Sequence, residues 1–344
     1  MASTNQTTQQ ISQKPFGISL NGLLAFGVFL ILFVFFSIFA NNFFSVRGVL
    51  NLLVQTSTFV IFSLGETLVL IVGGIDFSLG AEIAFSGTAV VIFSMIGIPI
   101  WLSMIMAIGL GGMIGLANGF LVARMRLQSF IVTIGMSFLI NGFLGSLGSI
   151  LPPPPGPITV PEGLGYLANK PVFAIFSQDA TGAPTVVFPG ISWIVIIMIL
   201  VVTFFHLVLT KTRIGRYLYL VGSNQTASRL SGIRVVRVRI IAFVLGGMLA
   251  GLAGVLLASR MMGSPGGASG YEFIAIACAM IGGANLVGGS GRIIGTMIGA
   301  FILSTLSMGL TMMNTNSPSI FTLLDGIVIL GAVYLERIRN RNEQ

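Results

Sequence analysis

Charged side chains are scarce in this chain of 344 residues: they make up 8% of the sequence, whereas soluble globular proteins average about 25%. Apolar residues make up 55%. So few charges could not cover the surface of a soluble protein of this length, so the sequence predicts a membrane protein. The 45 glycines agree with this, because small residues let helices approach closely in lipid.

Cysteine, histidine and lysine are also rare. Cys278 and His206 are the only residues of their kinds, which excludes an intrachain disulfide framework and argues against a cysteine/histidine metal cluster. None of the lysines, Lys14, Lys170 and Lys211, follows a glycine, as the phosphate-binding loop of an ATPase would require. HExxH and GxSxG patterns are lacking too. We therefore expect no enzyme and no cofactor, and any ATP-driven activity would need a separate ATPase subunit.

Long apolar runs dominate what is present, and a membrane-spanning helix needs about 20 such residues. They predict an all-α, polytopic membrane protein with about ten transmembrane helices in a single transmembrane domain, 1–344. We interpret the first run as an uncleaved span rather than a signal peptide, because it is long and lacks a cleavage site. The expected spans lie near 22–40, 49–72, 79–97, 99–123, 128–150, 191–209, 240–259, 272–288, 292–313 and 319–335.

The few charges predict the orientation of these spans. With the polar N-terminus (1–20) inside, all Lys and Arg residues but Arg47, Lys170 and Arg260 fall on the cytoplasmic side. This distribution follows the positive-inside rule and places both termini in the cytoplasm. The basic net charge of +8 is thereby explained without nucleic-acid binding. A proline-rich loop, 151–190, is expected to be external and to consist of extended and turn structure, and the basic loop 210–239 is expected to be cytoplasmic.

Carboxylates within the spans are candidates for function. Glu66 and Asp325 are expected to lie deep in the membrane. Each could line a water-filled path, as in a proton-coupled carrier, or could make a hydrogen bond between helices. Asp76, Glu82 and Glu272 lie at span ends or beside glycines, where a cap or an interfacial position costs little.

The segment GGIDFSLG (73–80), the first glycine box, interrupts an apolar run. It indicates either a broken helix at membrane depth, as in the pathways of transporters, or a tight cytoplasmic turn. Asp76 or Ser78 could cap the helix that follows. A second glycine box, GGANLVGG (282–289), matches the first at an offset of 209, which places Asn285 opposite Asp76 and suggests two related halves.

The cytoplasmic loop contains GRYLYLVGSNQTASRLSGI (215–233), which predicts a short helix capped by Asn224 or Ser223 and ended at Gly232. Ala227, Leu230 and Ile233 would share one face of this helix. Such an apolar stripe could dock a cytoplasmic partner. Alternatively, the helix could rest on the bilayer, which the surrounding arginines would also favour.

The motifs together resemble those of the permease subunits of ribose-type carbohydrate ABC importers. The first glycine box is similar to GGIDLSVG in that family, and the cytoplasmic loop is similar to GRxxYAxGxNxxAAxxSGI. LANGFLVARMRLQSFIVTIGM (116–136) and GYEFIAIACAMIGGANLVGGSGRIIGTMIGA (270–300) also follow the pattern of the family, in the same order. Departures include Ala284 and Asn285, which replace Thr-Ser, Asn141, which replaces an arginine, and Asp325.

The resemblance implies a subunit in the bacterial plasma membrane that translocates a sugar by alternating access. Its partners would be a cytoplasmic ABC ATPase, a periplasmic or lipid-anchored sugar-binding protein and a second permease subunit. A nucleoside, a furanose-like signal or an amino acid is an alternative substrate, and a proton-coupled carrier and a scaffold are alternative classes. The residues implied in ATPase docking are Gly222, Asn224, Ala227, Ser231 and Gly232. Candidates for the translocation path are Gly73, Gly74, Asp76 and Ser78 at the helix break, and Asn118, Thr133 and Asn141 from their polarity.

Overall fold

The computed structural model describes residues 20–150, 163–178, 184–265, 268 and 270–313, together with 323, 326, 327, 330 and 331. Helices make up most of these residues, as the sequence predicts. They are α1 (Leu20–Phe39), α2 (Val46–Ile71), α3 (Leu79–Met95), α4 (Ile100–Ala123), α5 (Ser129–Ile150), α6 (Tyr166–Asn169), α7 (Trp193–Lys211), α8 (Arg213–Ser223), α9 (Gln225–Leu230), α10 (Val235–Met261), α11 (Tyr271–Ile281) and α12 (Ile293–Met312).

Nine of the expected spans correspond to helices of the structure: α1 to α5, α7 and α10 to α12. In the described part of the chain, seven helices are long and apolar enough to cross a membrane, whereas α3 and α11 are shorter. The expected span 272–288 is too long, because α11 already ends at Ile281, where glycines follow. The expected span 319–335 and the N-terminal segment before Leu20 lie largely or wholly outside the described residues.

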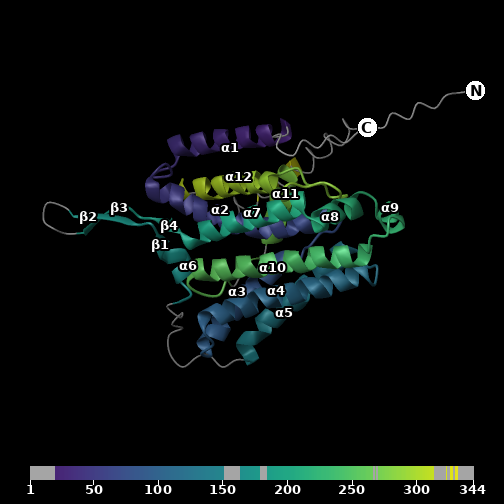
Figure 1. The fold of residues 1–344 in the computed structure, drawn as a ribbon. Helices are drawn as coiled ribbons and strands as arrows, with labels where there is room; N and C mark the ends of the chain where they lie inside the picture. Colours follow the sequence, from purple (N-terminus) through teal and green to yellow (C-terminus); the bar gives the residue numbers. More distant parts are fainter. Residues whose placement is uncertain are drawn as a thin grey trace, which may run out of the picture.

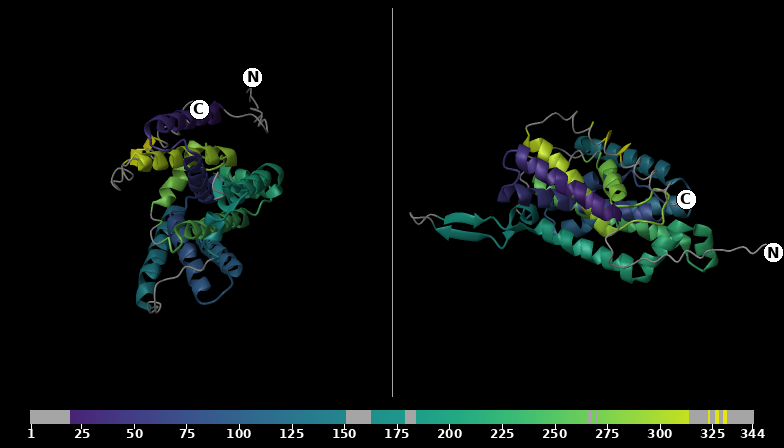
Figure 2. Two further views of the ribbon diagram at one scale, coloured as in Figure 1. Left: turned by 90° about the vertical axis from the view of Figure 1, so that its left-hand side faces the viewer. Right: turned by 90° about the horizontal axis from the view of Figure 1, so that it is seen from above.

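The long helices lie roughly side by side in a bundle, with α2 and α10 at its centre (Figure 1). α2 is buried along most of its length, whereas α1 lies at the edge against α12 and is largely exposed. The short helices α8 and α9 lie at one end of the bundle, and a hairpin of strands projects from the other end (Figures 1 and 2).

Close backbone contact between α4 and α10 forms the largest helix interface. At Gly111 of α4, a Cβ atom would overlap the carbonyl oxygen of Gly247, and at Gly247 it would overlap that of Gly111. Neither position can therefore hold a side chain without separating the two helices. Glycines thus allow the two backbones to approach, which replaces the hydrophobic effect as a source of association in lipid.

The loop 151–190 contains extended structure, as expected, where it is described. β1 (Pro171–Val172) pairs with β4 (Ile191–Ser192), and β2 (Ile175–Gln178) pairs with β3 (Pro184–Phe188), both in antiparallel register. The proline run at 151–157 lies outside the described residues. The short helix α6 packs against α10 and α7 at the end of the bundle from which β2 and β3 project.

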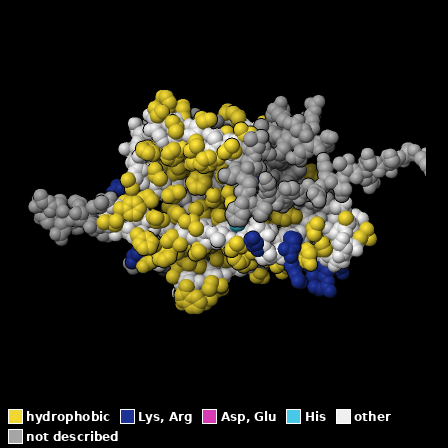
Figure 3. Space-filling model, turned by 45° about the horizontal axis from the view of Figure 1, so that its top comes forward, with side chains coloured by type: hydrophobic (Ala, Val, Ile, Leu, Met, Phe, Trp, Pro, Cys, Tyr) yellow, Lys and Arg dark blue, Asp and Glu magenta, His cyan; other side chains and the backbone are white. Residues whose placement is uncertain are grey.

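Apolar side chains cover much of the described surface that Figure 3 shows, whereas Lys and Arg side chains gather toward the end that carries α8 and α9. The exposed apolar residues come largely from the long helices and include Ile31, Ile38, Phe138 and Leu139, each about 70% exposed or more. Such a surface requires lipid as its solvent. The protein is therefore a multi-pass membrane protein.

Candidate functional site

The first glycine box is a buried break between α2 and α3. α2 ends in a left-handed Gly73 (φ 72°), whose N–H donates to the carbonyl of Leu70, while the N–H of Gly74 donates to that of Val69. This is the Schellman arrangement, which favours glycine. α3 begins only at Leu79 and its 17 residues span about 25 Å, less than the hydrocarbon thickness of about 30 Å.

Four consecutive backbone N–H groups of this break are bonded by side chains rather than by a helix. The N–H of Ile75 donates to Ser129 Oγ (3.2 Å) and that of Phe77 to Thr133 Oγ1 (3.0 Å), both on α5. The N–H of Asp76 donates to Glu66 Oε1 (3.2 Å), and that of Ser78 to Asp76 Oδ1 (2.8 Å).

Asp76 and Ser78 are buried in protein, at 2% and 0% exposure. Non-helical backbone at membrane depth is tolerated only when its polar groups are satisfied in this manner. The geometry therefore favours a broken helix over a tight turn at the surface.

Side chains on α2, α3 and α4 form one polar cluster with the break. Ser78 Oγ donates to Asp76 Oδ1 and lies 2.8 Å from Glu82 Oε1, and Asn118 Nδ2 donates to Ser78 Oγ (2.8 Å) and Glu82 Oε1 (3.3 Å). Glu66 Oε2, Glu82 Oε2 and Asn118 Oδ1 have no hydrogen-bond partner among the described residues. Hydrogen bonds between the break and three helices thus hold the cluster together.

The structure corrects two expectations about these residues. The Ser78 hydroxyl does not cap α3, because it is bonded to the side chains of the cluster instead. Asp76 and Glu82 do not occupy a cheap interfacial position but are as deeply buried as Glu66. Glu66 Oε1 accepts the N–H of Asp76 in the break rather than bonding to another helix, and Asp325 lies outside the described residues.

The second glycine box repeats the end of the first, but shifted by one residue from the expected alignment. Gly283 is left-handed (φ 95°) and donates to Met280, and Ala284 donates to Ala279. Gly283, rather than Gly282, is therefore the counterpart of Gly73, at an offset of 210. Asn285 nevertheless makes the same local bond as Asp76, since its Oδ1 accepts the N–H of Val287 two residues on, as Asp76 Oδ1 accepts that of Ser78.

The basic loop 210–239 forms two helices, α8 and α9, where the sequence indicated one. Asn224 is the N-cap of α9, as predicted, and its Oδ1 accepts the N–H of Ala227 (2.9 Å). Gly232 (φ 79°) ends the helix as predicted, since its N–H bonds to Arg229 and that of Ile233 to Ser228. Leu230 projects from α9 and is 85% exposed. The helix therefore presents an apolar side chain that this chain leaves uncovered.

α8 joins both glycine boxes at a single junction. A Cβ atom at Gly222 would overlap the carbonyl oxygen of Ile71, the last residue of α2, and would crowd the N–H of Gly289. The same N–H of Gly289 donates to Ile71 O (2.9 Å). Tyr219 OH donates to Gly291 O (2.8 Å), and burial raises the pKa of this phenol to about 12, so it keeps its proton as a donor. The backbone of α8 is therefore in direct contact with the end of α2 and with the second box.

The structure brings together most of the predicted site residues but not all. Asp76 and Ser78 lie in the first box, Asn118 and Thr133 bond to it, and Gly222 contacts the second box. Asn141 lies apart on α5 and is exposed, and among the described residues its amide bonds to Ser137 of the same helix. The sequence analysis missed Ser129. The one-turn spacing of Ser129 and Thr133 on α5 is the signal that could have identified them as a pair.

Comparison with known proteins agrees with this arrangement. Residues 48–333 match the family described as the permease component of branched-chain amino acid transport systems. The ribose import permease protein of Escherichia coli (strain K12) is 37% identical over 313 residues, which cover 89% of this chain and 91% of the relative.

The ribose import permease protein of Bacillus subtilis (strain 168) is 34% identical, with 96% and 98% covered, and the fructose import permease protein of Rhizobium meliloti is 33% identical, with 94% and 84% covered. No solved structure matches the chain. The chain therefore belongs to this family of import permeases and is a membrane subunit of an ABC importer rather than an enzyme.

Proposed function

We propose that this subunit translocates a monosaccharide of the ribose type across the bacterial plasma membrane, driven by a separate ATPase. The observation that carries the proposal is the junction at Gly222, where a surface helix contacts the ends of both glycine boxes. The relatives import ribose and fructose, which makes a neutral sugar the substrate to test first. A sugar needs no charged path, and the scarcity of charge in the chain agrees with this.

The ATPase would dock on α8 and α9, with Gly222, Asn224, Ala227, Ser231 and Gly232 forming the docking loop. Leu230, exposed beside these residues, supports a protein partner, because an apolar side chain in water gains from burial in a partner groove. Closure of the ATPase would move α8, and the contacts at Gly222 would pass this movement to Ile71 and Gly289.

The first glycine box would act as the hinge of the path. Gly73 and Gly74 permit the turn, while Asp76, Ser78, Asn118 and Thr133 fix the break to its neighbouring helices. Because these polar side chains bond to one another and are buried, we assign them to positioning the path rather than to holding the sugar.

A second permease subunit would cover α5. This helix exposes Asn141 together with Phe138 and Leu139, and its amide, whose one described bond is to Ser137, would be costly in contact with lipid. A partner subunit or a water-filled path between two subunits would satisfy it. We therefore place Asn141 on the interface or the path, apart from the cluster at the break.

The proposed topology has ten spans and both termini in the cytoplasm, with 151–190 outside and 210–239 inside. Arg216, Arg229, Arg234 and Arg237 at the α8–α9 end support this orientation, because positive charge marks the cytoplasmic side. The binding protein would then deliver the sugar at the end that carries the strands. The whole chain, 1–344, would form one permease domain.

Co-purification with the ATPase encoded beside this chain tests the docking assignment. Leu230→Gln is expected to lower the recovery of ATPase strongly, whereas Leu230→Met, which keeps an apolar side chain, retains it. The ligand preference of the neighbouring binding protein, measured over a panel of pentoses, hexoses, nucleosides and amino acids, tests the substrate. Preference for an amino acid or a nucleoside would reject the sugar but not the docking site.

A further inference from the structure

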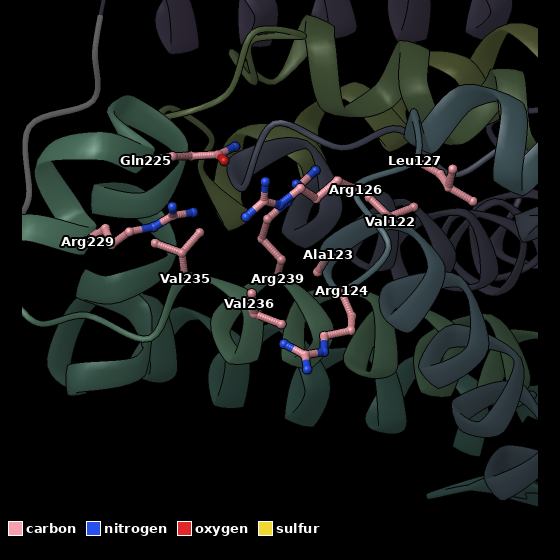
Figure 4. Close-up of a pocket in the computed structure, with 10 residues that line it drawn as sticks. All are labelled: Val122, Ala123, Arg124, Arg126, Leu127, Gln225, Arg229, Val235, Val236 and Arg239. Carbon is pink, nitrogen blue, oxygen red and sulfur yellow. The ribbon is translucent and has the colours of Figure 1, made fainter.

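A pocket rich in arginine lies between the connection of α4 and α5, the helix α9 and the start of α10. Its volume is about 270 Å³. Figure 4 shows the guanidinium groups of Arg126 and Arg239 pointing toward one another, with Arg229 directed into the same space from α9. Arg124 also lines the pocket, and the lining contains no Asp or Glu.

The guanidinium groups are not balanced by the part of the chain that the structure describes. Arg239 Nε is buried and has no hydrogen-bond partner there. The end of α4 contributes only about half a negative charge from its carbonyls, and the start of α10 contributes about half a positive charge, so these helix ends nearly cancel. Like charges that converge repel one another, so an anion bound between these guanidinium groups would be favourable.

The apolar lining and the volume of the pocket limit which anions could bind there. Val122, Leu127 and Val235 are among its apolar lining residues, which give the pocket one charged and one apolar side. The volume is just below the roughly 300 Å³ at which pockets for drug-sized ligands begin, so a small headgroup fits better than a nucleotide. Arg124 is the C-cap of α4 and Val235 the first residue of α10, so the pocket lies where both helices leave the apolar layer.

We propose that this pocket binds a phosphate group through Arg126, Arg239 and Arg229, supplied either by the headgroup of an anionic phospholipid or by a free phosphate. Arginine pairs favourably with phosphate because its fork of N–H donors matches two phosphate oxygens. Bound phosphate would link α9 to α10 and to the α4–α5 connection.

Native mass spectrometry of the purified protein tests this site with phosphatidylglycerol, cardiolipin and, as the zwitterionic control, phosphatidylethanolamine. The wild type is expected to retain the anionic lipids. Arg126→Gln with Arg239→Gln is expected to lower their affinity at least about tenfold, the equivalent of one lost charged contact or more. Arg237→Gln is the matched control, because it removes the same charge from α10 two residues away without lining the pocket, and it should change affinity less than about twofold.

Thermal unfolding separates a binding site from a structural role. Without phosphate or anionic lipid, the double variant should unfold at the same or a higher temperature than the wild type, because a repulsion is removed. With phosphate or anionic lipid present, the double variant should unfold at a lower temperature than the wild type. Competition by inorganic phosphate or glycerol 3-phosphate would identify a free phosphate as the ligand, whereas retention that only lipid supports would identify a headgroup. Equal affinity of the wild type and the double variant for both anionic lipid and inorganic phosphate, or equal loss in Arg237→Gln, would overturn the proposal.

Discussion

At the scale of single residues, the polar cluster around the first glycine box combines three buried carboxyl groups with one amide. Asn118 is its only described amide and the one donor that bonds both Ser78 and Glu82. The cluster therefore ties α4 to α3 and to the break. Removal of Asn118 should leave buried acceptors without their donor, which costs more than loss of an exposed bond.

Asn118→Leu is accordingly expected to lower the free energy of unfolding by about 1–3 kcal/mol. Thermal unfolding in detergent, followed by the fluorescence of Trp101 and Trp193, measures the change. Asn141→Leu is the control, since the amide of Asn141 is exposed and bonds only within α5. Equal destabilisation by both substitutions would show that the buried cluster contributes no more to the free energy of unfolding than an exposed hydrogen bond does.

Glu66 poses a different question, namely whether its carboxyl group carries protons. In Glu66→Gln the side chain keeps an oxygen that can accept the N–H of Asp76, so we expect sugar uptake within about twofold of the wild type. Glu66→Leu removes that acceptor and should impair uptake. Abolished uptake in Glu66→Gln, with normal insertion, would instead indicate a proton-coupled step.

At the scale of elements, Gly222 lets the backbone of α8 pack directly against Ile71 and Gly289. Gly222→Ala is expected to push α8 away from Ile71 and Gly289, and so to uncouple uptake from ATP hydrolysis while leaving membrane insertion intact. Gly109→Ala in α4 is the matched control, because a Cβ atom there meets open space. Full uptake by Gly222→Ala would remove the junction from the mechanism.

The cap of α9 gives a second prediction at this scale. Asn224→Ala removes the acceptor of the Ala227 N–H and should cost about 1 kcal/mol of helix stability. If docking needs an ordered α9, affinity for the ATPase should fall about fivefold, as that energy implies. Asn224→Asp keeps the cap and should restore binding. Weak binding by both variants would assign Asn224 to direct contact instead.

Local signals in the sequence were enough to predict α9. Asn224 and Gly232 marked the ends of α9 because capping depends on residues adjacent in the chain. The depth of Asp76 and Glu82 could not be predicted in this way, since it depends on α5 and α4 folding over the break. The position at which the second box ends its helix was also missed by one residue, because a run of paired glycines does not reveal which one is left-handed.

At the scale of the whole molecule, hydropathy predicted nine described helices, and the charge distribution predicted their orientation. The C-terminal end of α11 was predicted too late, because an apolar run does not show where glycines end its helix. The junction at Gly222 was equally hidden, since it unites residues from three distant parts of the chain. Its function depends on partners, so it must be tested in the assembled importer.

The most direct test is uptake into proteoliposomes that contain this chain, its ATPase and, on the outside, its binding protein. Ribose is the first sugar to test, with ATP enclosed or absent and with a proton gradient imposed or collapsed. The account predicts uptake that requires enclosed ATP and is indifferent to the gradient. Uptake that the gradient drives without ATP would contradict it.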